Sequence, residues 1–377
     1  MANISDYLYR KASINKIPLN GTFELSPVCN FSCKMCYVRK TMAQIKEEKK
    51  ELINWKEWLS LAEKCKDEGM LYLLLTGGEP FIYPNFKELY LELHKMGFLI
   101  SINTNGTMID DETIEWLKEA APHRVNITLY GTSADTYEKI CDNRNGYDLA
   151  VSAILKLKEA GIGVVINASM IPENEGDLED IIKFGKEHDI PTRVATYMFP
   201  PVRRTAEDSD SRFIPKEAAD LYIRRSRCYL DDDKYYEFLS SELRKIGEPI
   251  DSESDEIWGS NLEYMRCRAG RSTFWISWEG KMTACGMLDF PMVEYPFKKP
   301  FKECWLNLTN TVRTTKVMKE CNLCEKKEVC NPCVAMLYSE HRDVNKKASY
   351  MCEMTDLIIE NIKIAVQENK TDEKESK

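Results

Sequence analysis

Histidine, long apolar runs and an excess of positive charge are all scarce in this chain of 377 residues. Only four His are present and none is paired at ligand spacing, which disfavours imidazole-rich zinc or iron sites. A membrane helix needs about 18 consecutive apolar residues, and neither such a run nor a signal peptide is found. The 52 basic residues are outnumbered by 61 acidic ones, so nucleic acid and membranes are unfavourable partners. We therefore expect a cytoplasmic protein.

Cysteine, by contrast, is abundant. The chain has 14 Cys, and in a reducing compartment they are not expected to form disulfides. Thiols gathered at short spacings in such a protein indicate metal or redox chemistry. Hydrophobic residues make up 43% and charged residues 30% of the sequence, which excludes a fibrous or disordered protein and leaves ample material for a large core.

Six strand-like apolar runs alternate with helical segments, a pattern typical of a parallel sheet. Such βα units predict an α/β fold, specifically a partial (β/α)6 TIM-type barrel. Helix starts are expected at Asn85, at the caps Asp110 and Ser133, and at Asp177. The six runs are Thr22–Leu25, Leu71–Leu75, Phe98–Asn103, Arg124–Leu129, Ile162–Ser169 and Arg193–Met198.

The composition of the chain changes after the sixth strand-like run. A charged stretch and a helical segment from Pro215 to about Ile246 precede a Cys-rich region, in which Trp275 and Trp278 are expected in the core of a small domain. We therefore divide the chain into an N-terminal segment (1–21), a partial barrel (22–200), a helical bridging region (201–260), a small Cys-rich α+β domain (261–355) and a helix end with a disordered tail (356–377).

Three thiols, Cys29, Cys33 and Cys36, directly follow the first strand and so lie at the carboxyl end of the barrel, where such folds carry out chemistry. Three thiolates can hold three irons of a [4Fe–4S] cluster and leave the fourth iron open to a substrate or cofactor. The alternative is a structural zinc site, which would need a fourth Cys or His nearby. None lies between Cys36 and Cys65.

This arrangement resembles the radical S-adenosylmethionine (SAM) superfamily, whose signature is three Cys spaced x3 and x2 after the first barrel strand. Met35 stands where the family usually has an aromatic residue, and Tyr37 follows. The resemblance implies that SAM chelates the open iron and that an electron arrives from a flavodoxin- or ferredoxin-type reductant. Cleavage of SAM then yields a 5′-deoxyadenosyl radical that abstracts hydrogen, which makes Cys29, Cys33 and Cys36 catalytic.

Two further runs of residues agree with that resemblance. The run Gly77-Gly78-Glu79-Pro80 matches the family's GGEP loop at the SAM amino group, where glycines permit close approach to a ligand and Glu79 and Pro80 stiffen the turn. Asn103, Thr104 and Asn105 resemble the ribose-side loop, although an ordinary Asn-Gly turn is an alternative reading.

Thr128 ends the fourth strand where relatives often have Ser, and Arg144 follows where relatives often hold the methionine carboxylate. Leu129-Tyr130-Gly131 departs from the family's commoner leucine-aspartate-glycine, so Tyr130 has no assigned role.

Seven thiols in the last third form a second set. It resembles the SPASM extension of radical SAM enzymes, which carries auxiliary [4Fe–4S] clusters; a zinc ribbon is the alternative. By resemblance, Cys321, Cys324, Cys330 and Cys352 hold a distal cluster. Cys267, Cys285 and Cys333 hold a proximal one that lacks a fourth thiol, for which Cys228 and Cys304 are spare. Two residues separate Cys330 from Cys333, whereas the family usually has three at this point.

Two further cysteines, Cys65 and Cys141, lie within helical patterns and are expected to be plain buried thiols.

SPASM relatives act mostly on ribosomal peptides or proteins, so we expect a peptide maturase that forms a cross-link or oxidises a side chain or α-carbon. Only 28 residues precede Cys29, too few for a leader-peptide domain, so a separate recognition protein is a possible partner. The first alternative is a sulfatase-maturase that forms formylglycine. The second is a non-enzymatic, zinc-stapled binding protein.

Overall fold

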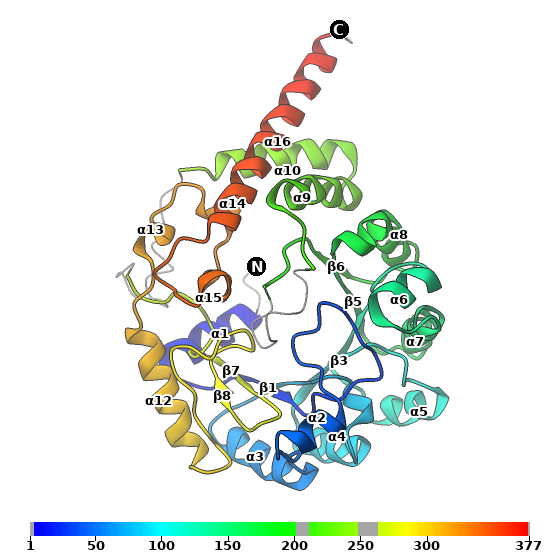
Figure 1. Ribbon diagram of the computed structural model, residues 1–377, viewed down its shortest axis with the longest axis vertical. Helices are drawn as coiled ribbons and strands as arrows, with labels where there is room; N and C mark the ends of the chain where they lie inside the picture. The colour runs from blue at the N-terminus through cyan, green and yellow to red at the C-terminus, as the bar shows by residue number, and fades with distance from the viewer. Residues whose placement is uncertain (1–3, 201–210, 248–262, 376–377) are drawn as a thin grey trace.

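The computed structural model describes residues 4–200, 211–247 and 263–375, with side chains described as far as residue 369. Its centre is one sheet in the order β6-β5-β4-β3-β2-β1-β7-β8. All neighbouring strands are parallel except β7 and β8, and the sheet curves into a ring that does not close (Figure 1). The strands are β1 (Asn20–Glu24), β2 (Tyr72–Thr76), β3 (Leu99–Thr104), β4 (Arg124–Thr128), β5 (Val164–Ser169), β6 (Thr192–Ala195), β7 (Thr273–Ile276) and β8 (Met282–Thr283).

Helices cover the outer face of this sheet (Figure 1). Apolar side chains at alternate strand positions pack beneath them. Phe23, Leu75, Ile102 and Ile127 are fully buried on this face. The covering helices are α2 (Met42–Glu47), α3 (Trp55–Asp67), α4 (Phe86–Lys95), α5 (Asp111–Glu119), α6 (Ala134–Cys141), α7 (Gly146–Glu159) and α8 (Leu178–Glu187), with short 3₁₀ turns η1 (Pro80–Ile82) and η2 (Pro172–Asp177).

Side-chain caps explain where two of these helices begin. The Asp110 carboxylate accepts from the Thr113 N–H at 2.8 Å, and the Ser133 hydroxyl accepts from the Thr136 N–H at 3.1 Å. Both caps satisfy backbone donors that lack an intrahelical partner, as predicted. Asn85, in contrast, adopts a left-handed conformation before α4 and makes no side-chain cap.

The remaining helices flank the barrel. A helix at the N-terminal end, α1, lies beside the strands, and α9 packs against the long C-terminal α16 (Figure 1). Their bounds are α1 (Ile4–Asn15), α9 (Pro215–Tyr229), α10 (Asp232–Arg244), α12 (Phe301–Thr314), α13 (Lys319–Asn322), α14 (Lys327–Cys330), α15 (Val334–His341) and α16 (Ser349–Glu375). Helix α16 runs to Glu375, through the segment for which composition predicts a disordered tail.

All six predicted barrel strands are present, each with bounds within a few residues of those expected. The structure adds a seventh parallel strand: β7 pairs with β1, so Trp275 belongs to the barrel sheet instead of a separate small-domain core. Its indole N–H donates to the buried Glu24 carboxylate at 3.2 Å. Trp278 is buried against Val38 and Ile45, near the first Cys loop, and not in a separate core either.

Candidate active site

The inner face of the barrel is polar. Asn103 on β3, Asn126 on β4 and Asn167 on β5 line one cavity inside the barrel. A closed TIM barrel fills its interior with bulky branched side chains. An amide-lined interior of this kind is instead suited to bind a polar molecule.

The loop after β1 carries the three predicted cluster thiols to the carboxyl edge of the sheet. Cys33 is buried, and Cys29 and Cys36 are half-buried. Cys29 interacts electrostatically with both other thiols, so the structure brings the three together. Within the loop, the Cys36 N–H donates to the Cys33 carbonyl at 3.1 Å, and the Ser32 N–H ties the loop to α6 by donating to the Cys141 carbonyl at 2.9 Å.

Backbone N–H groups point at two of these sulfurs. The Phe31 N–H donates to Cys29 Sγ at 3.4 Å, and the Arg39 N–H donates to Cys36 Sγ at 3.3 Å. Such bonds favour the thiolate over the thiol. Burial nevertheless raises the pKa of Cys29 to about 12. A thiol in this position becomes a thiolate when a cation compensates its charge, as iron does.

The GGEP loop after β2 packs directly on the loop that carries the thiols. A methyl group added to Gly78 would lie 2.2 Å from the Val28 carbonyl oxygen, and one added to Gly77 would lie 2.4 Å from the Ser26 carbonyl oxygen. The N–H of Gly78 donates to that Ser26 oxygen at 2.7 Å. The close approach for which these glycines are needed is thus made to neighbouring backbone.

Glu79 connects this loop to the next one. Its carboxylate, 1% exposed, accepts from the Thr104 hydroxyl at 2.7 Å and from the Asn105 N–H at 2.9 Å. It also accepts from the Phe81 N–H at 3.1 Å and so caps η1, which starts at Pro80. Burial raises the pKa of Glu79 to about 7, although these donors oppose the shift. The predicted stiffening role of Glu79 is therefore visible in its contacts.

The predicted ribose-side residues have local partners. The Asn105 amide N–H donates to Asn30 Oδ1 at 2.8 Å, on the Cys loop, while Thr104 contacts Glu79. Asn103 lies deeper in the barrel and accepts from the Asn126 amide at 2.8 Å. Thr128 ends β4, on the same inner face. Their role toward SAM stays a prediction.

Arg144 lies between α6 and α7, with its side chain exposed. It pairs with Asp135 at 2.5 Å and with Glu138 at 2.8 Å, both on α6. These contacts raise its pKa. Binding of a methionine carboxylate by Arg144 would require exchange of these two partners, and that role also stays a prediction.

Two residues without an assigned role adjoin the cluster loop. A hydrogen bond from the Cys141 thiol lowers the pKa of Cys33, while Cys141's own pKa is raised by the same contact. Tyr130 also hydrogen-bonds Cys33, and its burial raises the pKa of the phenol. Cys141 is thus buried as predicted, but against the cluster loop. The Leu-Tyr-Gly departure from the family pattern was the only sequence signal at Tyr130.

The second set of thiols also gathers. Burial raises the pKa of Cys321 to about 11, and Cys352, Cys330 and Cys324 add to that shift. Cys330 interacts with Cys352 and Cys324 as well. The four thiols come from α13, the following loop, α14 and α16, and they are the four predicted for the distal cluster.

Cys267 adjoins Cys333, since the Cys333 charge helps burial to raise the pKa of Cys267. The Ala269 N–H donates to Cys267 Sγ at 3.4 Å, as at the first loop. The two spare thiols have other surroundings. Cys304 adjoins Glu294, and Cys228 adjoins Glu179 and Arg224.

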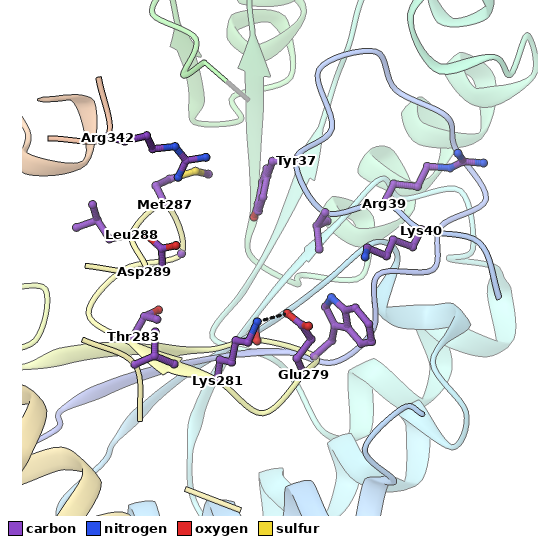
Figure 2. A pocket seen from close by; sticks show the side chains of 15 residues that line it. Tyr37, Arg39, Lys40, Glu279, Lys281, Thr283, Met287, Leu288, Asp289 and Arg342 are labelled. Carbon is purple, nitrogen blue, oxygen red and sulfur yellow. Dashed lines mark hydrogen bonds and ion pairs between the residues drawn. The ribbon is translucent and has the colours of Figure 1, made fainter. Parts of the chain in front are cut away.

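A cavity of about 280 Å³ separates the first Cys loop from the Cys-rich region. Figure 2 shows Tyr37, Arg39 and Lys40, which directly follow Cys36, on one side of this cavity. Met287, close to Cys285 in the chain, lies across from them with Arg342. The cavity thus lies between the predicted radical cluster and a predicted ligand of the proximal auxiliary cluster.

Within the described ranges, no three His, Cys, Asp or Glu side chains converge on a point suited to one metal ion. Each thiolate of a [4Fe–4S] cluster binds its own iron, so the thiols of such a site need not converge. Three neighbouring thiols, with N–H donors on two of their sulfurs, fit that group. Among the same residues, no helix is both long and apolar enough to cross a membrane.

Comparisons with known proteins agree with this geometry. Residues 23–185 match the Radical SAM superfamily. The AdoMet-dependent heme synthase of Methanosarcina barkeri is 23% identical over 87% of this chain and 94% of its own length. The sporulation killing factor maturation protein SkfB of Bacillus subtilis is 26% identical over 44% of this chain and 39% of its own.

Solved structures that share the fold over most of the chain include two with bound peptides. Streptococcus suis SuiB bound to its precursor peptide SuiA has a TM-score of 0.68 at 19% identity, covering 93% of this chain and 82% of SuiB. Native anSMEcpe with bound AdoMet and the Cp18Cys peptide has a TM-score of 0.63 at 17% identity, covering 93% of this chain and 99% of anSMEcpe.

Fold and thiols together define an iron–sulfur enzyme with an open α/β barrel. The barrel is a radical SAM domain, and the Cys-rich region predicted as its SPASM extension follows it in the chain. The chain thus contains a radical SAM domain, and enzymes of this superfamily use SAM and a [4Fe–4S] cluster. The alternative of a non-enzymatic, zinc-stapled binding protein is wrong.

Proposed function

We propose that this enzyme oxidises a peptide or protein substrate, as a maturase that forms a cross-link or modifies a side chain or α-carbon. The observation that carries the proposal is the fold, which resembles that of SuiB bound to its precursor peptide over 93% of the chain. SkfB, a maturation protein, is a relative over 44% of this chain. A reducing cytoplasm and a flavodoxin- or ferredoxin-type reductant complete the proposal.

Cys29, Cys33 and Cys36 would hold the cluster, and SAM bound there supplies a 5′-deoxyadenosyl radical. The residues around them position and protect this chemistry. Glu79 fixes the GGEP loop and the loop after β3 relative to each other through its three hydrogen bonds. The substrate must be positioned before the radical forms, because a radical formed before its target is in place would react with the protein.

The Cys-rich region would act as an electron sink. Removal of a second electron from the substrate radical requires an acceptor, and Cys321, Cys324, Cys330 and Cys352 would hold one auxiliary cluster. Cys267, Cys285 and Cys333 would hold a second. The cavity between Tyr37 and Met287 supports this arrangement, because a substrate group there would lie between the two Cys regions.

A haem-precursor substrate is the second candidate. It is favoured by the heme synthase relative, which aligns over 94% of its own length, whereas SkfB aligns over 39%. Formylglycine formation is the third, on the likeness to anSMEcpe bound to a Cys-containing peptide.

The three candidates are separated by one experiment. The reconstituted enzyme is incubated with SAM, dithionite and, in parallel, a deuterated peptide encoded beside its gene, a sulfatase peptide or Fe-coproporphyrin. Our proposal predicts transfer of deuterium into 5′-deoxyadenosine, and loss of substrate hydrogen, with the neighbouring peptide. Transfer from the sulfatase peptide or the porphyrin alone would reject it.

A further inference from the structure

Every hydrogen-bonding group of the Asn105 side chain, just after β3, has a partner within the protein. Its carbonyl oxygen Oδ1 accepts from the Thr107 N–H at 2.9 Å and from the Thr107 hydroxyl at 2.7 Å. Its amide nitrogen Nδ2 donates to Asn30 Oδ1 at 2.8 Å and to Cys29 Sγ at 3.7 Å. An asparagine side chain has two lone pairs and two N–H donors, and all of them are thus used. Because Asn105 is also only 6% exposed, a ribose oxygen could bind this amide only by displacing one of these partners.

The orientation of this amide is fixed by its neighbours. A half-turn about its last bond would bring Oδ1 toward Asn30 Oδ1 and Nδ2 toward the Thr107 N–H, so that like groups would face each other. Asn30 is held in its own orientation, because its amide N–H donates to the Thr107 hydroxyl at 2.8 Å. The backbone of Asn105 is held as well, since its N–H donates to the buried Glu79 carboxylate at 2.9 Å. One amide N–H of Asn105 is therefore directed at the Cys29 sulfur.

Cys29 Sγ, the acceptor of this N–H, is a predicted ligand of the barrel cluster. It also accepts from the Phe31 N–H at 3.4 Å, so a backbone donor and a side-chain donor converge on this sulfur. Uptake of one electron makes an iron–sulfur cluster and its thiolates more negative, and hydrogen bonds to the sulfurs stabilise the more negative state. Each such donor therefore raises the reduction potential. Of these two donors, only the Asn105 amide can be removed by substitution.

We propose that Asn105 is a positioning residue of the barrel cluster: its amide N–H holds the iron-bound Cys29 thiolate and makes one-electron uptake from the flavodoxin- or ferredoxin-type reductant more favourable. This role takes the place of the predicted contact between Asn105 and the SAM ribose. The sequence alone does not reveal it, because Asn105 and Cys29 are 76 residues apart. The inference goes beyond the proposed function, since it rests on the cluster of the radical SAM domain and not on the substrate.

The experiment measures the reduction potential of the barrel cluster by EPR, in the full, reconstituted chain without SAM. The signal of that cluster is identified as the one that changes when SAM is added. Asn105→Ser keeps an oxygen that can accept from the Thr107 N–H, but its side chain is too short to reach Cys29. We expect about tenfold weaker electron uptake, which is a fall of about 59 mV for a one-electron couple. Asn30→Ser, the matched control, removes the other partner of the same amide and keeps the wild-type potential.

Asn105→Asp is a second variant of the same residue. It keeps both bonds from Thr107 but turns a charged oxygen toward Cys29, so its potential is expected to fall further than that of Asn105→Ser. A wild-type potential in either Asn105 variant overturns the proposal, as does an equal fall in Asn30→Ser. SAM affinity is measured by calorimetry on the same samples, and weaker SAM binding by Asn105→Ser at an unchanged potential would identify a ribose contact instead. No peptide is present, so failure of the proposed maturase activity leaves this test unaffected.

Discussion

Gly78 leaves no room for a side chain where the GGEP loop meets the Cys loop. Because a methyl group there would lie 2.2 Å from the Val28 carbonyl oxygen, Gly78→Ala must push the Cys loop outward. We expect a loss of about 1–3 kcal/mol in the free energy of unfolding, together with reduced iron at the barrel cluster. Thermal unfolding and iron analysis measure both. Gly176→Ala, where nothing lies within 4 Å, is the control; equal stability of the two variants would contradict the assigned contact.

A substitution of Glu79 tests whether this single residue holds the GGEP loop and the loop after β3 together. Glu79→Gln replaces one acceptor by an N–H₂ group that faces a donor, either the Asn105 N–H or the Thr104 hydroxyl. A buried donor left without an acceptor costs about 1–3 kcal/mol. We expect lower thermal stability and a raised KM for SAM, because two loops lose their common anchor. An unchanged melting temperature would show that Glu79 does not tie the loops together.

Some residues of the candidate site could be predicted from the sequence and others could not. The three Cys and the GGEP run were recognisable because their spacing is local. The reason for the glycines was not, since Ser26 and Val28 meet them only through tertiary packing. Cys141 and Tyr130 contact Cys33 for the same reason and were not assigned from the sequence. The alternation that makes the inner face polar is visible in Arg124-Val-Asn126-Ile-Thr128, but which side faces inward depends on the curvature of the sheet.

Among the elements, α16 links the Cys-rich region to the flank of the barrel. It carries Cys352 and packs on α9, to which Asn361 donates a hydrogen bond at Asp220, and the next residue, Ile362, is fully buried. Ile362→Ala is expected to cost about 2–5 kcal/mol in the free energy of unfolding and to lower the iron retained by the distal thiols. Ile364→Ala, on the same helix but 50% exposed, is the control. Chemical denaturation and iron content compare them, and matching losses would contradict the packing role of Ile362.

Strands were predicted correctly where a strand and the helix that follows it are close in the sequence, as for the run Leu71–Leu75. The sequence pattern did not predict that β7 joins the barrel sheet, because the four residues of β7 form a short pattern and its partner β1 lies near the other end of the chain. Trp275 could be assigned to the barrel sheet only from that pairing.

For the molecule as a whole, the two Cys regions predict its iron content. Three [4Fe–4S] clusters amount to about twelve irons per chain, and one to about four. Cys321→Ala is expected to remove the distal cluster, and with it product formation, while SAM cleavage at the barrel continues. Iron analysis beside product assay measures this. Loss of all iron in Cys321→Ala would contradict separate sites.

Formation of 5′-deoxyadenosine tests the central claim most directly. The anaerobically reconstituted enzyme is supplied with SAM and dithionite, and the nucleoside is quantified. We expect it from the wild type and from Cys65→Ala, whose thiol is buried on α3. Cys33→Ala should yield none. Wild-type rates in Cys33→Ala, or no 5′-deoxyadenosine from an iron-replete wild type, would contradict the account.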